Sequence, residues 1–349
     1  MILNFRNLDL LKQMDVNTNN TNTRVVSDTY LSYTKSLWIY VPPCFLTIGT
    51  ISSIVSIVVL VRKPMRGSTT MFYLTVLSFG DILVLNTGLL RHWIQITLDV
   101  NIRDFSDFIC KFHVFMTYFT LDFTTWILVA VTFDRCLSVC MPLKSMVYCT
   151  VRQSRFVVVI IAFLTLLLNG HLLFTVGTID GACQELNSFV SLYWPYIDFA
   201  SFCLLPFITM VICNIFIIRA LTKAMKMFHS VQKGDKNKCS FEISARTRQN
   251  RKSNVTTMLL SVNAAFFFCT FPVSVFFICD PFFREQYPDL MELLEAVSNL
   301  LMYLNNSIHF FLYCITGTKF RNELIRMFTR KKRTDGVSVS YTIDTSVPN

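Results

Sequence analysis

The chain has 349 residues, of which 53% are hydrophobic and only 15% are charged, and its formal net charge is +10. An ordinary globular domain carries about 25% charged residues, so this composition excludes intrinsic disorder and a collagen-like chain and argues strongly against a soluble enzyme. We therefore expect a protein that resides in a lipid bilayer.

Seven apolar stretches are long enough to cross a bilayer as helices, which takes about 20 residues each. The predicted spans are residues 37–61, 70–90, 109–133, 156–178, 196–221, 255–279 and 290–316. They are too long to be the strands of a membrane barrel. The second and seventh spans are the least apolar, because they carry Asp81 and Glu292 with Glu295. The predicted fold class is an all-α membrane protein, a seven-transmembrane helix bundle.

Three further regions are predicted around the bundle, which covers residues 37–316. They are an extracellular N-terminal arm at 1–36, a short amphipathic cytosolic helix at 317–330 and a disordered cytosolic tail at 331–349. The apolar residues that share one face of the amphipathic helix are Phe320, Leu324, Met327 and Phe328. This helix should therefore lie on the inner leaflet and contact membrane lipid.

The basic residues are distributed unevenly between the two sides of the predicted membrane. If residue 1 is outside, 24 of the 32 Lys and Arg fall in the segments that lie inside. Cytosolic segments of membrane proteins are enriched in Lys and Arg, so this bias places the N-terminus outside the cell. A glycosylation sequon at Asn19 falls in the external arm and agrees with this orientation. Because the positive charge flanks the spans, it does not indicate nucleic-acid binding.

Short motifs at fixed places in several spans narrow the choice among seven-helix proteins. The second span contains Leu77-Ser78-Phe79-Gly80-Asp81, and the third begins near Cys110 and ends with Asp134-Arg135-Cys136. The later motifs are Leu205-Pro206-Phe207, Cys269-Thr270-Phe271-Pro272 and Leu312-Tyr313. In order and spacing these motifs resemble the rhodopsin-like (class A) G-protein-coupled receptors. The stretch 306–314 is similar to a branch of invertebrate neuropeptide receptors that includes the FMRFamide type.

The resemblance implies a multi-pass receptor in the plasma membrane whose partner is a heterotrimeric G protein, with arrestin as a further expected partner. It also implies that Asp134 holds Arg135 while the receptor rests, that release lets Arg135 face the G protein, and that Tyr313 is a further coupling residue. Arginine suits this role because its charge is permanent and its planar fork pairs with a carboxylate through two hydrogen bonds.

The same resemblance implies a disulfide and an activation hinge. Cys110 and Cys183 are expected to be bonded at the external side. Pro206 and Pro272 remove backbone hydrogen bonds from membrane helices and leave bends, which would let the sixth helix swing outward. The residues expected at this hinge are Pro206, Phe266, Thr270 and Pro272, with Thr270 in a place where the family usually has Trp.

Asp81 is a charge at bilayer depth, and such a charge usually marks a functional site. In the family this acid binds sodium with polar neighbours, which here are Thr124, Asn305, Asn306 and His309. No other cofactor is expected. The alternative is a protonated Asp81 that is hydrogen-bonded to Asn306 or His309, since His309 replaces the usual Asn of the family and competes with sodium as a cation.

The expected ligand is a short, basic, amidated peptide. In the positions of Thr117 and Tyr303, amine receptors have an aspartate and opsins a lysine, so both ligand classes are excluded. Acids near the external ends of the last five helices include Asp198 and Glu295, which fall within predicted spans and would pair with a cation of the ligand. The alternatives are a receptor for a non-peptide small molecule and a seven-helix channel or transporter. No arrangement of residues indicates an enzyme.

Overall fold

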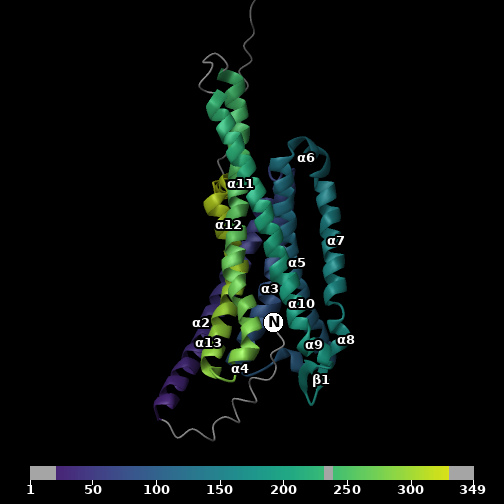
Figure 1. Ribbon diagram of the computed structural model, residues 1–349, viewed down its shortest axis with the longest axis vertical. Helices are drawn as coiled ribbons and strands as arrows, with labels where there is room; N and C mark the ends of the chain where they lie inside the picture. The colour runs from purple at the N-terminus through teal and green to yellow at the C-terminus, as the bar shows by residue number, and fades with distance from the viewer. Residues whose placement is uncertain (1–20, 232–238, 330–349) are drawn as a thin grey trace, which may run out of the picture.

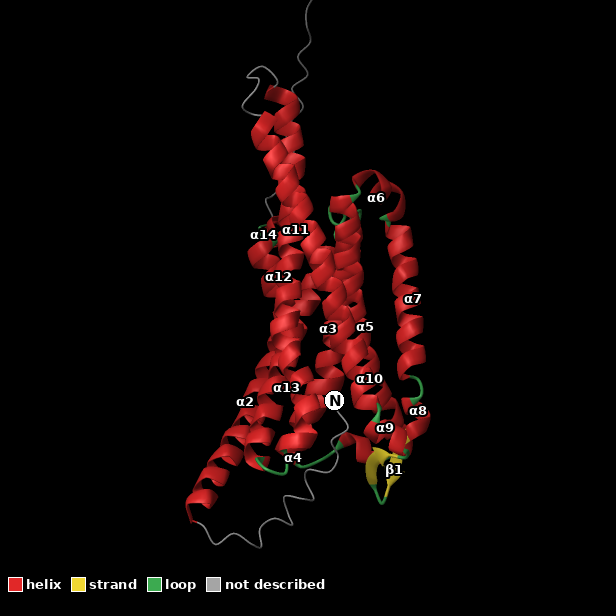
Figure 2. Ribbon diagram, in the orientation of Figure 1, coloured by secondary structure: helices red, strands yellow, loops and turns green. Residues whose placement is uncertain are grey.

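A computed structural model describes residues 21–231 and 239–329, which are helical nearly throughout (Figure 1). The long helices run roughly along one axis, and a two-stranded hairpin lies at one end of them (Figure 2). We call this the hairpin end and the opposite end, where α6 (Pro142–Tyr148) lies, the α6 end. The predicted sequon at Asn19 and the predicted tail lie outside the described residues.

Seven long helical segments correspond to the seven predicted spans. They are α2 (Thr21–Leu60); α3 (Thr69–Val84), which continues through a π-helical turn into α4 (Leu90–Leu98); α5 (Asp107–Cys140); α7 (Val151–Asn169); α10 (Trp194–Asp198), which continues through the π-helical turn Phe199–Leu204 into α11 (Leu205–Val231); α12 (Cys239–Phe283); and α13 (Pro288–Thr316). Within the described residues, six are long and apolar enough to cross a membrane, and α13, with three acids in its first two turns, is not among these six. The predicted fold class is confirmed.

Several predicted boundaries differ from the structure; α12, for example, begins at Cys239 and not at residue 255. The first helix begins at Thr21, so the boundary predicted at residue 37 falls inside α2. The fourth span was predicted to end at residue 178, but α7 ends at Asn169, and after the short helix α8 (Leu172–Thr175) the chain forms β1 (Val176–Ile179). This end of the prediction is wrong because a continuous apolar run does not distinguish a helix from a strand.

The hairpin has its own sequence signal. β1 pairs antiparallel with β2 (Ala182–Glu185), and the two residues between them, Asp180 and Gly181, have φ angles of 52° and 81°. An Asp-Gly pair with positive φ at both positions is a preferred two-residue hairpin turn. After β2, the short helix α9 (Ser188–Leu192) leads into α10.

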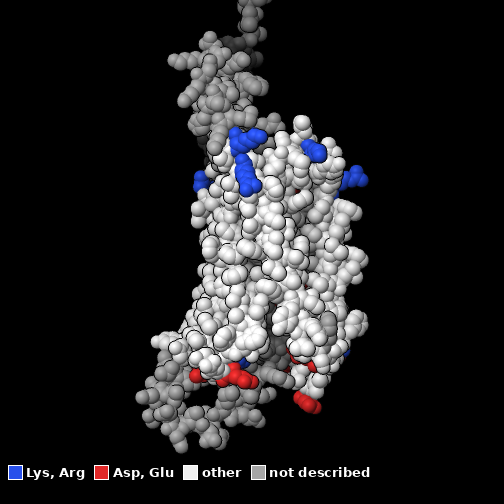
Figure 3. Space-filling model, viewed as in Figure 1, with Lys and Arg blue, Asp and Glu red and all other residues white. Residues whose placement is uncertain are grey.

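The helices present apolar side chains outward as well as inward. On α7, the exposed residues Phe156, Val159, Phe163 and Leu167 follow one another at helical spacing. Figure 3 shows a broad middle band without charged side chains, which separates basic groups at the α6 end from acidic groups at the hairpin end. This band must face the hydrocarbon core of a lipid bilayer, because an apolar surface of this extent is not stable in water.

The interior is built around α5, which contacts α3, α7, α11 and α12. One apolar cluster lies toward the hairpin end and includes Tyr118, Trp194 and Tyr303. A second cluster lies toward the α6 end and includes Leu128, Phe266 and Tyr313 among others. Helix α5 therefore connects both groups of candidate site residues.

The last described helix, α14 (Thr318–Phe328), is the predicted amphipathic helix. Phe320 is buried and lies edge-on to Tyr313, with 5.7 Å between ring centroids. Glu323 is buried too, and its carboxylate pairs with Arg62 Nε at 3.1 Å and with Arg326 Nη1 at 3.6 Å. Phe328 is exposed on the outer side.

Candidate functional site

The predicted disulfide between Cys110 and Cys183 is present, with 5.6 Å between the two Cα atoms. It joins the first turn of α5 to β2. Two carboxylates support this connection: Asp107 Oδ1 accepts a hydrogen bond from Thr178 N at 3.1 Å, and Asp104 Oδ1 accepts one from Cys183 N at 2.9 Å. The hairpin is thereby fixed over the end of the bundle.

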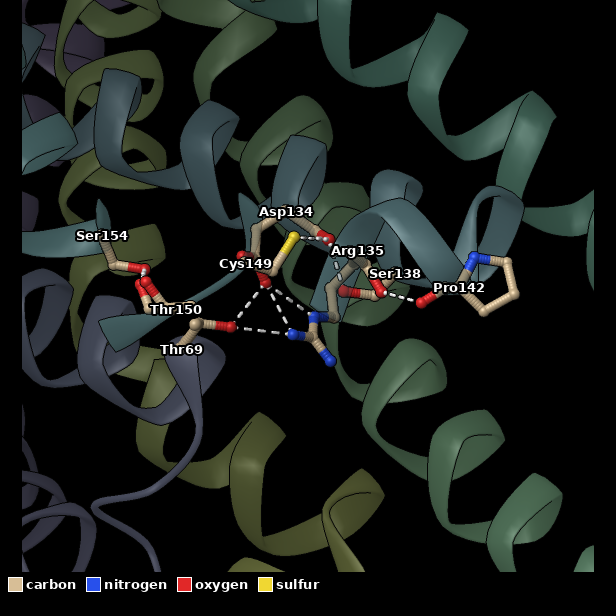
Figure 4. A network of polar contacts seen from close by, with 9 residues as sticks. Thr69, Asp134, Arg135, Ser138, Pro142, Cys149, Thr150 and Ser154 are labelled. Atoms are coloured by element: carbon tan, nitrogen blue, oxygen red, sulfur yellow. Dashed lines mark hydrogen bonds and ion pairs between the residues drawn. The ribbon is translucent and has the colours of Figure 1, made fainter. Parts of the chain in front are cut away.

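Arg135 and Asp134 form an ion pair at the opposite end of α5, as Figure 4 shows. Both Nε and Nη2 of Arg135 donate to Asp134 Oδ2, at 3.1 and 2.6 Å. Thr69, the first residue of α3, donates to the same oxygen at 2.8 Å and accepts a hydrogen bond from Arg135 Nη2 at 3.0 Å. The hydroxyl therefore ties α3 to the ion pair, and no pattern in the sequence indicated this role.

Tyr313 lies away from this ion pair. Its ring is buried between His309, at 6.3 Å between ring centroids, and Phe320 of α14. The structure thus separates the predicted coupling residues into an ion pair on α5 and an aromatic contact between α13 and α14.

Asp81 is fully buried on α3, and its Oδ2 lies 2.8 Å from Nδ1 of His309 on α13. Thr124 Oγ1 donates to the backbone oxygens of residues 120 and 121, and Asn306 Nδ2 donates to Met302 O. The neighbouring cavity is lined by Thr124, Asn305, Asn306 and His309 among others, and its volume of about 10 Å³ is about that of one water molecule.

His309 competes with a sodium ion for Asp81 in the arrangement that the structure shows. Its imidazole occupies Oδ2 of Asp81, whereas the buried Oδ1 has no hydrogen-bond partner among the described residues, and Asp81 does not line the cavity. The buried Asn305 Oδ1 has no hydrogen-bond partner among the described residues.

The predicted hinge residues lie in two helices that face each other. Pro272 is inside α12, whereas Pro206 follows the π-helical turn Phe199–Leu204 at the start of α11. Phe266 is buried and lies edge-on to Phe202 of this turn, with 6.4 Å between centroids. Thr270 is buried, and its backbone oxygen accepts a hydrogen bond from the hydroxyl of Ser274, one turn later in the helix.

Between this hinge and the α6 end, a polar contact that the sequence did not indicate joins three helices. Asn263 Nδ2 of α12 donates to Thr132 Oγ1 of α5 at 3.0 Å and to Asn214 Oδ1 of α11 at 3.2 Å. All three side chains lie in apolar surroundings, where hydrogen-bonded amides are costly to separate.

The predicted pocket residues at the hairpin end have partners that were not foreseen. Glu295 pairs with Arg284 Nη2 at 2.7 Å, and Arg284 Nε also pairs with Asp280 at 2.6 Å. Glu295 therefore has a cationic partner within the chain, and its contact with a cation of the ligand stays a prediction. Thr117 lies 3.4 Å from Nη2 of Arg103.

Asp198, the last residue of α10, lies near another acid, Asp122 of α5. Ser201 Oγ donates to Asp122 Oδ1 at 3.1 Å and to the backbone oxygen of Asp198 at 3.4 Å, and Asn169 Nδ2 donates to Asp122 Oδ2 at 2.8 Å. Asp198 is 3% exposed, and its Oδ2 has no hydrogen-bond partner in the described part of the chain. This carboxylate is a candidate contact for a ligand.

Comparison with known proteins agrees with this architecture. Residues 52–313 match the model of the 7 transmembrane receptor (rhodopsin family). The chain belongs to the rhodopsin family of seven-transmembrane receptors. As such a receptor, it is a multi-pass membrane protein and not an enzyme, as predicted.

Similar proteins include receptors for neuropeptides. The chain is 23% identical over 309 residues to the FMRFamide receptor of Drosophila melanogaster, covering 82% of this chain and 52% of that receptor. It is 25% identical to FMRFamide peptide receptor frpr-18 of Caenorhabditis elegans (80% and 66% covered) and 22% identical to Neuromedin U receptor homolog nmur-2 of the same species (80% and 76% covered). The chain thus spans only about half the length of the Drosophila receptor.

Proposed function

We propose that this rhodopsin-family receptor lies in the plasma membrane with its N-terminus outside, binds a peptide at the hairpin end and activates a heterotrimeric G protein at the α6 end. Basic groups gather at the α6 end and acidic groups at the hairpin end (Figure 3). This distribution supports the orientation, because cytosolic ends of membrane proteins are rich in Lys and Arg. The disulfide supports it too, since disulfides persist outside the cytosol.

The observation that carries the proposal is the ion pair of Asp134 and Arg135, to which Thr69 is hydrogen-bonded, at the proposed cytosolic end. All of these groups are held on one carboxylate oxygen, so the guanidinium is occupied within the receptor. A partner that binds this end gains Arg135 only when the ion pair opens. An agonist that favours the opened arrangement therefore favours the G protein as well.

A peptide ligand is supported by the names of the similar receptors and by the charged groups at the hairpin end. Asp198 remains the candidate contact for a cation of the peptide, whereas Glu295 is paired with Arg284. Arrestin at the α6 end, and lipid against the exposed side of α14, complete the proposed partners.

The test is a peptide-library screen on cells that express the chain with a promiscuous G protein, followed by agonist-driven nucleotide exchange in their membranes. Arg135→Ala should abolish exchange while surface expression is kept. Arg152→Ala is the matched control, because Arg152 is an exposed arginine at the same end of the bundle. Normal exchange by the Arg135 variant, or the absence of any responding peptide on a surface-expressed receptor, would contradict the proposed function.

A further inference from the structure

Asn263 of α12 lies where this helix meets α5 and α11, and it has no part in the mechanism proposed above. Its side chain is buried, as is that of its partner Thr132, and Asn214 is half-buried. The residues one helical turn from these three belong to the apolar cluster of the α6 end, and they are Leu128, Met210, Leu259 and Phe266. A polar amide in such a place is costly unless its hydrogen bonds are made within the protein.

Both amide hydrogens of Asn263 are used between helices. A side-chain amide nitrogen carries two hydrogens, and this one donates to Thr132 Oγ1 at 3.0 Å and to Asn214 Oδ1 at 3.2 Å. Thr132 Oγ1 is free to accept because its own hydrogen goes to the backbone oxygen of Leu128 at 2.8 Å. The two acceptors belong to α5 and α11, so a single side chain of α12 joins both neighbouring helices.

The position of Asn263 along α12 connects it with the predicted hinge and with the ion pair. It lies nine residues before Pro272, which is about 13 Å along a helix, so a change of bend at the proline displaces this amide far more than the residues next to the proline. Its partner Thr132 lies one turn before Arg135 on α5. The ion pair of Arg135 ties α5 to Thr69 of α3, whereas the hydrogen bonds of Asn263 tie α5 to α12.

We propose that Asn263 holds α12 against α5 and α11 in the resting receptor, and that activation breaks both of its hydrogen bonds together. This inference rests on the proposed function, whose regulation it specifies. The two bonds start from one amide, so an outward movement of α12 breaks them in one step, and cytosolic water that enters behind the helix then satisfies the separated groups. Asn263 is therefore a positioning residue, which acts through the place of α12 and sets the ratio of open to resting receptors.

The first experiment measures nucleotide exchange by a G protein without ligand, in membranes that contain equal amounts of each receptor variant. Asn263→Leu keeps the approximate shape of the side chain and removes both hydrogen bonds. Single hydrogen bonds between membrane helices are weak, so the loss of two should raise the ratio of open to resting receptors, and with it basal exchange, by about 5- to 30-fold. A purely structural role predicts the opposite, because damaged packing lowers the amount of active receptor.

Variants of the acceptor test the same bond from the side of α5. Thr132→Val removes one hydrogen bond and should raise basal exchange by a smaller factor, whereas Thr132→Ser keeps the hydroxyl and should give the wild-type value. Combining Thr132→Val with Asn263→Leu should add nothing to Asn263→Leu alone, because both changes remove the same bond. Thr165→Val is the matched control, since Thr165 is a buried threonine of α7 whose hydroxyl donates to backbone oxygens of its own helix.

The second experiment follows α12 itself in the purified full chain, without a G protein. The distance between genetically encoded spin labels at two exposed positions, Arg152 of α7 and Thr257 of α12, is measured by pulsed electron paramagnetic resonance. If about 1% of wild-type receptors are open at rest, Asn263→Leu should add a longer distance in about 5% or more of the molecules, and Thr165→Val should not.

The two experiments separate the failure of this inference from the failure of the proposed function. If the longer distance appears but exchange does not rise, Asn263 holds α12 as inferred and the proposed activation of a G protein fails. If Asn263→Leu and Thr132→Val reach the cell surface but neither adds the longer distance nor raises exchange, the inference is overturned, whereas the receptor function is still decided by Arg135→Ala and the peptide screen. A rise of the same size in Thr165→Val would overturn it too.

Discussion

Thr69→Val tests whether the hydroxyl of α3 keeps the receptor at rest. The substitution preserves shape but removes the hydrogen bond to Asp134 and the one from Arg135, at 2.8 and 3.0 Å. Hydrogen bonds to charged groups contribute about 1.5–3 kcal/mol. If these bonds exist only at rest, their loss shifts the equilibrium toward the opened state by about 10- to 150-fold.

The assay is nucleotide exchange by a G protein in membranes without any ligand. If about 1% of wild-type receptors are open at rest, Thr69→Val should raise the open fraction to about 10% or more, and basal exchange should rise in proportion. Thr75→Val is the matched control, because Thr75 is on the same helix but donates only to the backbone oxygen of Met71. Basal exchange that is the same in the wild type and both variants would refute the reasoning.

Three further substitutions have defined outcomes in thermal unfolding of the purified receptor. Cys183→Ser opens the disulfide and should destabilise the fold by about 2–5 kcal/mol, so an unchanged unfolding temperature would contradict its structural role. Arg284→Gln leaves Glu295 half-buried without its cation and should lower the unfolding temperature, and adding Glu295→Gln should restore part of the loss; a double variant as unstable as the single one would argue against the pair. His309→Asn removes the imidazole from Asp81, so replacing choline chloride by sodium chloride should raise the unfolding temperature of this variant by about 2 °C or more and leave that of the wild type unchanged. A rise in the unfolding temperature of the wild type with sodium would show that the ion binds in spite of His309.

The sequence predicted the seven helices well, because long apolar runs and the positions of Lys and Arg carry that information directly. The order of motifs also identified Cys110 with Cys183, and Asp134 with Arg135. The end of the fourth span was missed although Asp180-Gly181 gives a strong turn signal, since the apolar run before it continues into the strand.

Most of the pocket could not be predicted, because it depends on pairing across helices. Arg91 of α4 and Arg103 of the turn Ile102–Phe105 both count as external basic residues in the sequence, and this count gave no indication that both side chains are buried. In the same way, Glu295 looked like an unpaired acid until the structure placed Arg284 next to it. Charge counts describe a surface, whereas the partner of each charge is decided by the fold.

The attachment of α14 has a consequence for how the receptor can be studied. Its buried Glu323 is tied to Arg62 at the end of the first helix, and its Phe320 lies under Tyr313. The helix is therefore held by protein contacts on its inner side, so it should keep its place in detergent micelles that contain no anionic lipid. A spectroscopic label on the exposed Phe328 position would then register a displacement of α13 through the Tyr313–Phe320 contact, and lipid could be added back as a separate variable.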